Sequence, residues 1–248
     1  MDLSIFFKEN PKSAVAFSGG VDSAYLLYAA SLYGIKTKAY YVKTAFQPQF
    51  EFEDAKRIAD ELHTDIAVIE EDILKQDQIV FNSPERCYFC KKRLFSLIMQ
   101  AAKDDGFSLL LDGTNASDDV SDRPGMKALK ELSVRSPLRE CGFTKEVVRS
   151  RSMEAGLFTW NKPAYACLAT RIPTGTVITA EKLSNIEKAE DYIHKLGFTD
   201  FRVRIFADCA KIQVSENQLD KLLKHRELIL KELKKYYADV LLDLEVRR

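Results

Sequence analysis

The sequence has no excess of charge of either sign, no long apolar run and no basic start. Its 248 residues include 37 Lys plus Arg and 37 Asp plus Glu, which leaves a formal net charge of +0. Such a chain has no positive field to gather polyanions, so no nucleic-acid partner is expected. No apolar run is long enough to span a bilayer and residues 1–8 do not resemble a signal peptide, so we expect a cytoplasmic protein that binds no membrane.

A disulfide framework is not expected either. The chain has five cysteines, an odd number, and no export signal, a combination that fits thiols or metal ligands better than disulfides. The three histidines are scattered through helical segments, and we assign none of them a catalytic role. The cysteines therefore need a chemical explanation.

Short apolar runs alternate with helical periodicity in the first half of the chain. The apolar runs are residues 14–17, 39–42, 66–69 and 109–111, and helical patterns begin at Asp22 and cover residues 52–62 and 91–102. Continuous apolar strands separated by helices predict an α/β fold, with a parallel sheet covered by helices on both faces. Ligands of such sheets bind at the carboxyl ends of the strands.

The pattern changes in the second half. Residues 113–171 are rich in Pro, Gly, Ser and charge around one helix at 145–155, which predicts pocket-forming loops. The pattern then predicts a helix at 181–196, adjacent strands at 201–206 and 210–214, a further helix, and a strand at 240–244. Ser215 followed by Gln218 is a capping-box start for that further helix. We expect two domains, 1–172 and a small α+β domain at 173–248.

The clearest motif is Phe-Ser-Gly-Gly-Val-Asp-Ser, which ends the first apolar run and begins the first helix. Glycines there let backbone N–H groups converge on an anion at the helix N-terminus. We expect Ser18, Gly19, Gly20 and Ser23 to bind a pyrophosphate group and Asp22 to hold Mg²⁺. No Gly-Lys-Ser/Thr follows, so this is not the loop that grips a transferring γ-phosphate. The arrangement suits attack on an α-phosphate with loss of pyrophosphate.

An ordinary glycine turn is the alternative, which two glycines alone would not exclude. Six matching residues in a strand-turn-helix context disfavour it, and we expect a positive φ at Gly20, so that Gly20→Val would block phosphate binding. The motif resembles the PP-loop ATP pyrophosphatases, which have an adenine nucleotide alpha hydrolase-like fold and include amidotransferase synthetase domains, NAD synthetases, tRNA thiolases and sulfur transferases. The resemblance implies that fold and the use of ATP, but not a substrate.

The cysteines fall into two groups. Cys87 and Cys90 form a Cys-x-x-Cys pair at the start of a helix rich in Lys and Arg, a setting that favours thiolates, and Cys167 precedes Leu-Ala-Thr-Arg. A pair of this kind can share a metal or cluster, act as a redox dithiol, or be two small buried residues. Cys141 and Cys209 lack this setting and are interpreted as structural. A zinc site would need one of them, and we rank it below an iron–sulfur cluster.

Short motifs spread over nearly the whole chain occur together in one family. They are the phosphate loop and residues 85–95, 112–115, 123–125, 136–138, 167–173 and 202–204. The combination resembles the ATP-dependent sulfur transferases of nickel-pincer nucleotide cofactor synthesis, the LarE family. Members adenylate a carboxylate of pyridinium-3,5-biscarboxylic acid mononucleotide and replace an oxygen with sulfur, which gives a thiocarboxylate.

The resemblance also implies roles for single residues. It places Gly113 at the nucleotide, Arg202 and Arg204 at the phosphate of the mononucleotide substrate, and Arg171 beside the charge that develops on the acyl-adenylate. Solvated strand arginines and a surface salt bridge are the alternatives. The acidic loop residues Asp118, Asp119 and Asp122 are interpreted as solvated, with Mg²⁺ binding as the alternative reading.

Two forms of sulfur donation are known in this family. In one, a cysteine matching Cys167 gives up its sulfur and becomes dehydroalanine. In the other, cysteines matching Cys87, Cys90 and Cys167 hold a four-iron four-sulfur cluster. This chain has all three, so the resemblance implies the cluster form, supplied by sulfide or another sulfur donor, and we expect a homo-oligomer.

Other functions remain open from the sequence. Thiolation of a tRNA base is a runner-up, disfavoured by the zero net charge and the lack of an evident RNA-binding appendage. An amide-forming synthetase would need a glutaminase partner and would leave the cysteines idle. A nucleotide-binding module with a structural zinc site, without turnover, is the alternative from outside the enzymes.

Overall fold

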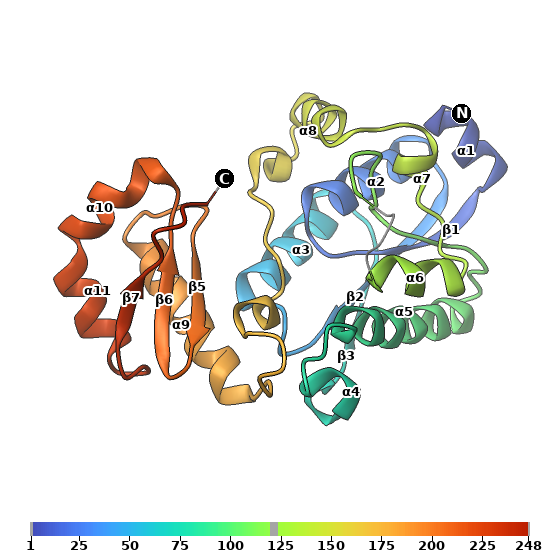
Figure 1. Cartoon of the computed structure of the whole chain (residues 1–248). Coiled ribbons are helices and arrows are strands. Elements are labelled where there is room, and N and C mark those ends of the chain that lie inside the picture. Colours follow the sequence, from blue (N-terminus) through green and yellow to red (C-terminus); the bar gives the residue numbers. More distant parts are fainter. Residues whose placement is uncertain (1, 120–123, 248) are drawn as a thin grey trace. The chain divides into compact units, whose positions relative to one another are not determined.

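A computed structural model describes residues 2–119 and 124–247 of the chain (Figure 1). The chain divides into two compact units. The first comprises Met1–Ile73 and Glu85–Tyr165, and the second comprises Leu74–Pro84 and Ala166–Arg248. Within the described residues, no helix combines the length and the apolar character that crossing a membrane requires.

The first unit is built on a parallel sheet with strand order β3-β2-β1-β4. The strands are β1 (Lys12–Ala16), β2 (Lys36–Lys43), β3 (Ile66–Glu70) and β4 (Leu110–Leu111). Beyond β4, a parallel bridge between Leu111 and Arg135 adds one more position to this edge. The predicted parallel sheet is confirmed, and its strands end on the side where α2 begins (Figure 1).

Helices cover both faces of this sheet. They are α1 (Leu3–Glu9), α2 (Val21–Leu32), α3 (Gln49–Glu61), α5 (Arg86–Asp104), α6 (Pro124–Glu131), α7 (Pro137–Glu140), α8 (Lys145–Glu154) and the 3-10 turn η2 (Phe158–Asn161). Strand residues alternate between two cores: Val15 and Tyr41 pack with α2, whereas Ala14 and Tyr40 pack with Ile98 of α5. Because both faces of the sheet are covered, consecutive residues in the middle of β1 and β2 are apolar.

The second unit contains a three-stranded sheet with order β5-β6-β7. Strands β5 (Arg202–Phe206) and β6 (Cys209–Gln213) form an antiparallel pair, and β7 (Val240–Leu242) runs parallel to β6. The helical elements of this unit, apart from the turn η1 (Ile73–Lys75) at its first junction, are α4 (Asp77–Val80), η3 (Leu168–Arg171), α9 (Ala180–Lys195), η4 (Glu216–Gln218), α10 (Leu219–Lys224) and α11 (Arg226–Leu233). The predicted small α+β unit is confirmed.

The capping box predicted at Ser215 is wrong. Its hydroxyl contacts the side chains of Asn217 (2.7 Å) and Gln218 (2.6 Å) instead of a backbone N–H, and the chain starts a 3-10 turn there. The predicted single helix is divided at His225 into α10 and α11. The side chains of Asn217 and Gln218 thus compete with the backbone N–H groups for the Ser215 hydroxyl.

The second unit does not begin where the sequence pattern changes. It starts at Ala166, so the predicted boundary between residues 172 and 173 lies inside it, and it also takes in Leu74–Pro84. Hydrogen bonds explain why Leu74–Pro84 belongs to the second unit, because the carbonyls of Val80 and Asn82 accept from the N–H groups of Ile178 and Gly175. A segment between two elements of the first unit is thereby part of the second.

Candidate functional site

The phosphate loop joins β1 to α2 at the carboxyl end of the strand. Gly20 is the N-cap of α2, and Gly19 has a φ of +73°. A Cβ at Gly19 would lie 3.0 Å from the Cβ of Ala55 on α3, so a side chain is excluded by both backbone and space. Gly20 has a φ of −80°, so the positive φ expected there is wrong and belongs to Gly19.

The two serines of the loop contact one another. The Ser18 and Ser23 hydroxyls are 3.0 Å apart, and the Ser23 hydroxyl also donates to the carbonyl of Gly20 at 3.2 Å. Ser23 is buried, whereas Ser18 is exposed. Ser23 therefore braces the turn, and Ser18 presents its hydroxyl at the surface where an anion would bind.

Asp22 lies in the first turn of α2 and has two partners from distant parts of the chain. Its Oδ1 accepts from the side-chain amide of Asn115 at 3.2 Å, and its Oδ2 accepts from the ammonium group of Lys145 at 2.5 Å. Asn115 follows β4, and Lys145 begins α8, so the fold brings both to the start of α2. The result is a charged cluster beside a helix N-terminus that already favours anions.

Gly113 lets the loop after β4 approach α2 closely. A Cβ at this position would lie 2.8 Å from the backbone nitrogen of Ser23, a distance that real side chains do not adopt. Asp112 fixes the same loop, because its carboxylate accepts from the hydroxyls of Thr114 (2.5 Å) and Ser136 (2.6 Å). The absence of a side chain at Gly113 therefore permits this close approach, and its predicted place at the nucleotide stays a prediction.

Lys145 and Asn115 are the site residues that sequence reasoning missed. Lys145 starts the helix inside the loop-rich segment, and a lysine in the first turn of a helix is unfavourable for the helix dipole, which is the sequence signal for it. Asn115 belongs to the motif at residues 112–115, in which the resemblance implies a role for Gly113 only. Asp118 accepts from the backbone N–H of Asn115 at 2.9 Å, which gives it a structural partner, and Asp122 lies outside the described residues, as does Arg123 of the Arg-Pro-Gly motif.

Cys87 and Cys90 occupy the first turns of α5, as expected. Cys87 is exposed and Cys90 half-buried, and residues three apart on a helix share a face. The guanidinium of Arg86 lies 3.6 Å from the Cys87 sulfur. Two cysteine sulfur atoms on one helix face can both serve as ligands of a metal or cluster.

Cys167 caps the turn η3 in the second unit, and Arg171 ends this turn. Arg171 donates to the carbonyl of Ala166 at 2.8 Å and forms a bidentate ion pair with Glu190 at 2.9 and 3.1 Å. Glu190 also accepts from the backbone of Val203 on β5 at 2.9 Å. Arg171 is only 2% exposed, so the surface salt bridge considered as an alternative is wrong. The pair connects the Cys167 turn to β5.

We expect Glu190→Gln to lower the free energy of unfolding by about 3 to 5 kcal/mol, because it leaves the buried Arg171 charge without its counter-charge. Glu61→Gln is a matched control, since the Arg57–Glu61 pair is 60% and 42% exposed and such pairs contribute about 0 to 1 kcal/mol. Urea unfolding of both variants measures the difference. Equal small losses of unfolding free energy in both variants would mean that the buried pair contributes no more to stability than the exposed pair.

Arg202 and Arg204 point to one face of β5. Arg202 is buried and donates to the carbonyl of Phe201 at 2.6 Å, and the half-buried Arg204 donates to Gln213 at 2.6 Å. Burial, and then the neighbouring charges of Arg171 and Arg247, lower the pKa of Arg204. The two are therefore not solvated strand arginines.

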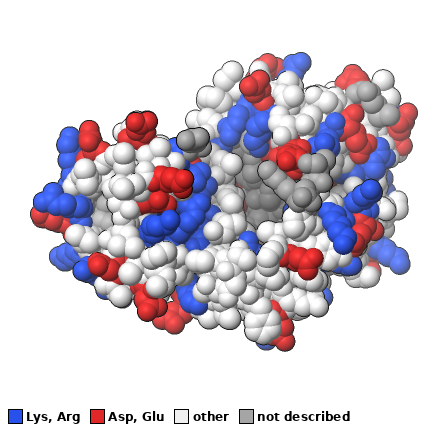
Figure 2. Space-filling view, in the orientation of Figure 1, with Lys and Arg blue, Asp and Glu red and all other residues white. Residues whose placement is uncertain are grey.

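This face of the small sheet carries several cations, and two of them pair with acids. Lys211, opposite Arg204 on β6, pairs with Asp243 at 2.9 Å, and Arg247 pairs with Asp200 at 2.7 Å. Figure 2 shows blue and red side chains side by side over these strands. Arg204 lies among the charges of Arg171, Arg247, Asp243 and Glu190, and its guanidinium is of the kind that binds an anionic group.

The remaining cysteines have different surroundings. Cys141 packs against the core of the first unit, and burial raises the pKa of its thiol. Cys209 is half-buried on β6. Within the described part of each unit, no group of three or more His, Cys, Asp or Glu side chains lies close enough together to hold a metal ion.

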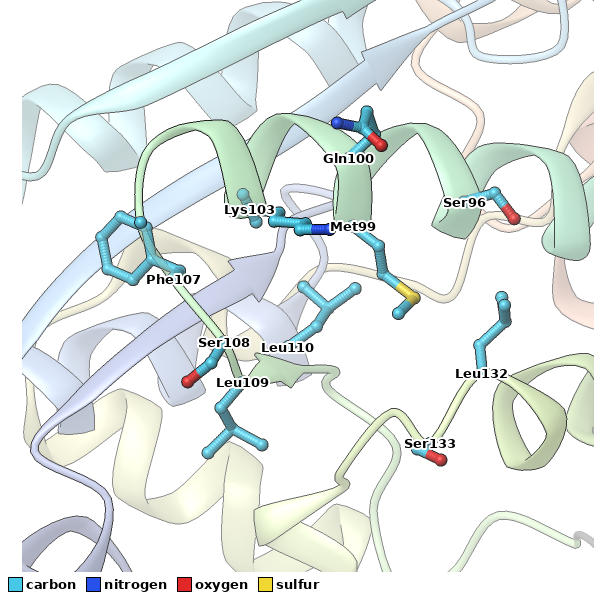
Figure 3. A pocket seen from close by; sticks show the side chains of 12 residues that line it. Ser96, Met99, Gln100, Lys103, Phe107, Ser108, Leu109, Leu110, Leu132 and Ser133 are labelled. Atoms are coloured by element: carbon cyan, nitrogen blue, oxygen red, sulfur yellow. The ribbon is translucent and has the colours of Figure 1, made fainter.

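A groove of about 700 Å³ lies elsewhere on the first unit. It is formed by the second half of α5, the segment before β4 and the residues after α6, and Met99, Leu110 and Leu132 are among the side chains that line it (Figure 3). It lies at the amino end of β4, the side of the sheet opposite to the phosphate loop. None of the candidate site residues lines it.

Comparisons with known proteins give relatives that match over most of the chain. No family model matches the sequence. A pyridinium-3,5-bisthiocarboxylic acid mononucleotide synthase of Lactiplantibacillus plantarum is 33% identical over 96% of this chain and 87% of its own length. An uncharacterized protein of Synechocystis is 34% identical over 98% of this chain and 92% of its own length. A tRNA-specific 2-thiouridylase of Thermotoga maritima is 28% identical over 61% of this chain and 54% of its own length.

Proposed function

The chain belongs to the LarE family of pyridinium-3,5-bisthiocarboxylic acid mononucleotide synthases, and we propose on that premise that it is an ATP-dependent sulfur transferase of nickel-pincer nucleotide cofactor synthesis. Its substrate is then pyridinium-3,5-biscarboxylic acid mononucleotide or a close relative of it. The reaction forms a thiocarboxylate, AMP and pyrophosphate.

One observation supports the ATP-dependent step. The carboxylate of Asp22 lies beside the glycine loop at the start of α2, between the side chains of Asn115 and Lys145. Backbone N–H groups at a helix start bind phosphate oxygens, and a carboxylate beside them can hold Mg²⁺. Lys145 supplies a positive charge where negative charge develops on the departing pyrophosphate.

The adenylation step proceeds by in-line displacement. A carboxylate oxygen of the substrate attacks the α-phosphorus of ATP, the bond from that phosphorus to the bridging oxygen breaks, and pyrophosphate leaves with the electron pair. A sulfur nucleophile at the oxidation level of sulfide then attacks the activated carboxyl carbon. AMP leaves, the carbon keeps the sulfur, and the proton of hydrosulfide passes to solvent.

The sulfur-supplying centre rests on three cysteines. Cys87 and Cys90 present two thiols from one helix face next to a guanidinium, and Cys167 caps a turn braced by the buried Arg171. Cysteine sulfur ligands of this kind fit an iron–sulfur cluster. A four-iron cluster held by three thiolates would supply an iron open to exogenous sulfide.

Arg204→Ala is expected to weaken binding of the mononucleotide by roughly 1.5 to 3 kcal/mol, the contribution of a hydrogen bond to a charged group. ATP affinity should barely change. Calorimetric titration of each ligand measures both values, and Arg226→Ala, a change at an exposed arginine of the same unit, is the control. Equal losses for ATP and mononucleotide would place Arg204 at the nucleotide instead.

Arg202→Ala is expected to weaken mononucleotide binding similarly and to destabilise the fold as well. Its side chain is buried and donates to the backbone of Phe201. Arg204 is therefore the cleaner probe of the phosphate site.

The proposed function is tested by anaerobic incubation of the purified protein with ATP, Mg²⁺, sulfide and the biscarboxylic acid mononucleotide. We expect one pyrophosphate and one AMP released for each sulfur that appears in the mononucleotide. Release of pyrophosphate only in the presence of tRNA, with sulfur in a tRNA base, would replace the proposal by thiolation of RNA, the activity named for the 28%-identical relative. ATP binding without any release of pyrophosphate would indicate a nucleotide-binding module that has no turnover.

A further inference from the structure

The groove beside β4 lies where the sheet of the first unit stops short of a full fifth strand. Arg135 pairs with the outer edge of β4, because its N–H donates to the carbonyl of Leu110 at 3.0 Å and its carbonyl accepts from the N–H of Asp112 at 2.9 Å. The pairing is parallel and consists of a single bridge with Leu111. A strand that continued toward the amino end of β4 would need the residues that precede Arg135.

Those preceding residues leave the edge of the sheet. Ser133 has a left-handed φ of +55°, and its N–H donates to the carbonyl of Lys130 at 3.1 Å. The N–H of Val134 donates to the carbonyl of Leu129, also at 3.1 Å. Both bonds close the carboxyl end of α6, as helix-ending turns do. The chain therefore turns away from the sheet, and Leu110 and Ser133 both line the groove that results.

A backbone donor of β4 faces this groove. The carbonyl of Leu109 accepts from the N–H of Ala14 on β1 at 2.8 Å. In a trans peptide the C=O and the following N–H point in opposite directions, so the N–H of Leu110 points away from β1 and toward the outer edge. Among the described residues, no backbone hydrogen bond outside the strand ladder uses this N–H. A strand edge of this kind can pair with another extended chain.

The walls of the groove add apolar contacts to this donor. Met99, which is 36% exposed, points from α5 into the groove, and Leu132 lines it from the end of α6 (Figure 3). The volume of about 700 Å³ falls within the range of roughly 300 to 1,000 Å³ in which proteins bind ligands. A main-chain donor beside apolar side chains is the combination that strand addition uses.

The charge at one end of the groove is positive. Lys103 is the one ionisable side chain among the twelve described residues that line the groove. The ammonium group of Lys12 lies 5.1 Å from the ring centroid of Phe107, which is another lining residue. The neighbouring acids Asp104 and Asp105 do not line the groove, and Asp105 pairs with a lysine of β2 at 2.7 Å. An acidic segment therefore complements this end of the groove.

We propose that this groove is a docking site for an extended acidic segment of a partner protein, which adds a strand to the edge of β4 next to the Arg135 bridge. A carbonyl of the segment accepts from the N–H of Leu110, and its apolar side chains contact Met99 and Leu132. Its acidic side chains lie toward Lys103. The proposal goes beyond sulfur transfer and does not depend on it, because none of the candidate site residues lines the groove.

Amide hydrogen exchange of the full chain, measured for single residues by NMR, tests whether the edge is open. The N–H of Leu110 should exchange at least about 100-fold faster than that of Ala14, which is hydrogen-bonded inside the sheet. Equally slow exchange of the two amides would mean that the edge is already closed, and it would overturn the proposal.

The probe for binding is a synthetic peptide of about six residues, the usual length of a strand, which alternates Glu and Val and is blocked at both ends. Saturating peptide should slow the exchange of the Leu110 N–H at least about tenfold. A peptide that alternates Lys and Val should bind at least about tenfold more weakly in calorimetric titration. Equal binding of the two peptides, or an unprotected Leu110 N–H, contradicts an acidic strand at this edge.

Two exposed side chains of α5 allow the walls to be tested without disturbing the core. Lys103→Glu and Met99→Glu should each weaken binding of the acidic peptide by about three- to tenfold, because each places a negative charge in the groove. Met153→Glu is the matched control, since Met153 is 52% exposed on α8 and does not line the groove. Binding that is insensitive to both groove variants, or equally sensitive to the control, would rule out this docking site.

Two further measurements separate the alternatives. Pyrophosphate release should be the same in the wild type and in all three variants, so a failure of the proposed function leaves the peptide measurements decisive. Protection of the Leu110 N–H that rises with protein concentration, in the absence of peptide, would assign the edge to a second copy of this chain and overturn the partner-protein proposal.

Discussion

Replacement of Asp22 by alanine is expected to reduce Mg²⁺-dependent pyrophosphate release by at least about 1,000-fold, because the several kcal/mol that a bound metal ion gives to the transition state would be lost. Asp22 is the only carboxylate inside the phosphate loop and first turn. Its contacts with Asn115 and Lys145 hold it beside the phosphate loop, where we propose that the phosphates of ATP bind. Pyrophosphate release at several Mg²⁺ concentrations measures the effect.

The fold should survive this substitution. The Asp22–Lys145 pair is partly exposed, with side chains 22% and 34% accessible, and such pairs contribute about 0 to 1 kcal/mol to stability. Asp105→Ala is the control, because it removes a comparable ion pair with Lys38, of 2.7 Å, at the amino-terminal side of the sheet. Unchanged release in Asp22→Ala would remove the metal-holding role of this residue.

Replacement of Cys87 by alanine is expected to remove bound iron and multiple-turnover sulfur transfer together. With two thiolates left, a four-iron cluster loses one of its three protein ligands. Anaerobic purification followed by iron and sulfide analysis measures the first effect, and product formed per protein molecule measures the second. Cys209→Ala removes a half-buried thiol from β6 and should retain both iron and activity.

The sacrificial alternative makes opposite predictions. If Cys167 donates its own sulfur, Cys87→Ala should still give one product per protein molecule. The intact wild-type protein would then stop after one turnover and lose about one H₂S of mass, with dehydroalanine at position 167. Iron-free protein with that modification would contradict the cluster, and zinc in place of iron would make the three cysteines structural.

The sheet and the phosphate loop were predictable because each depends on nearby residues. Apolar runs bounded by turns gave the strands, and Gly19 and Gly20 between a strand and a helix gave the loop. The positive φ is at Gly19 and not at Gly20, and the sequence does not distinguish the two, because adjacent glycines can adopt it equally well. Local sequence locates such a turn, but it does not identify which of its residues packs against a distant segment of the chain.

The parts of the site that the sequence did not reveal all depend on long-range contacts. Lys145 reaches Asp22 from 123 residues away. Arg171 is an ordinary basic residue in its own segment, and it becomes a buried brace only because α9 brings Glu190 against it. The contacts of the Asn82 side chain with residues 172 and 173 have no sequence motif, since its partners are backbone carbonyls. Backbone partners leave no trace in side-chain patterns.

The membership of residues 74–84 in the second unit has a consequence for biosynthesis. These residues leave the ribosome long before residues 166–178, on which their hydrogen bonds depend. Domains generally complete folding as whole units during translation, the amino-terminal one first. In this chain, residues 74–84 cannot form their hydrogen bonds with residues 175 and 178 until most of the chain has been synthesised. A truncated product that ends at residue 165 would lack these hydrogen bonds. The chain thus completes its second unit only near the end of translation.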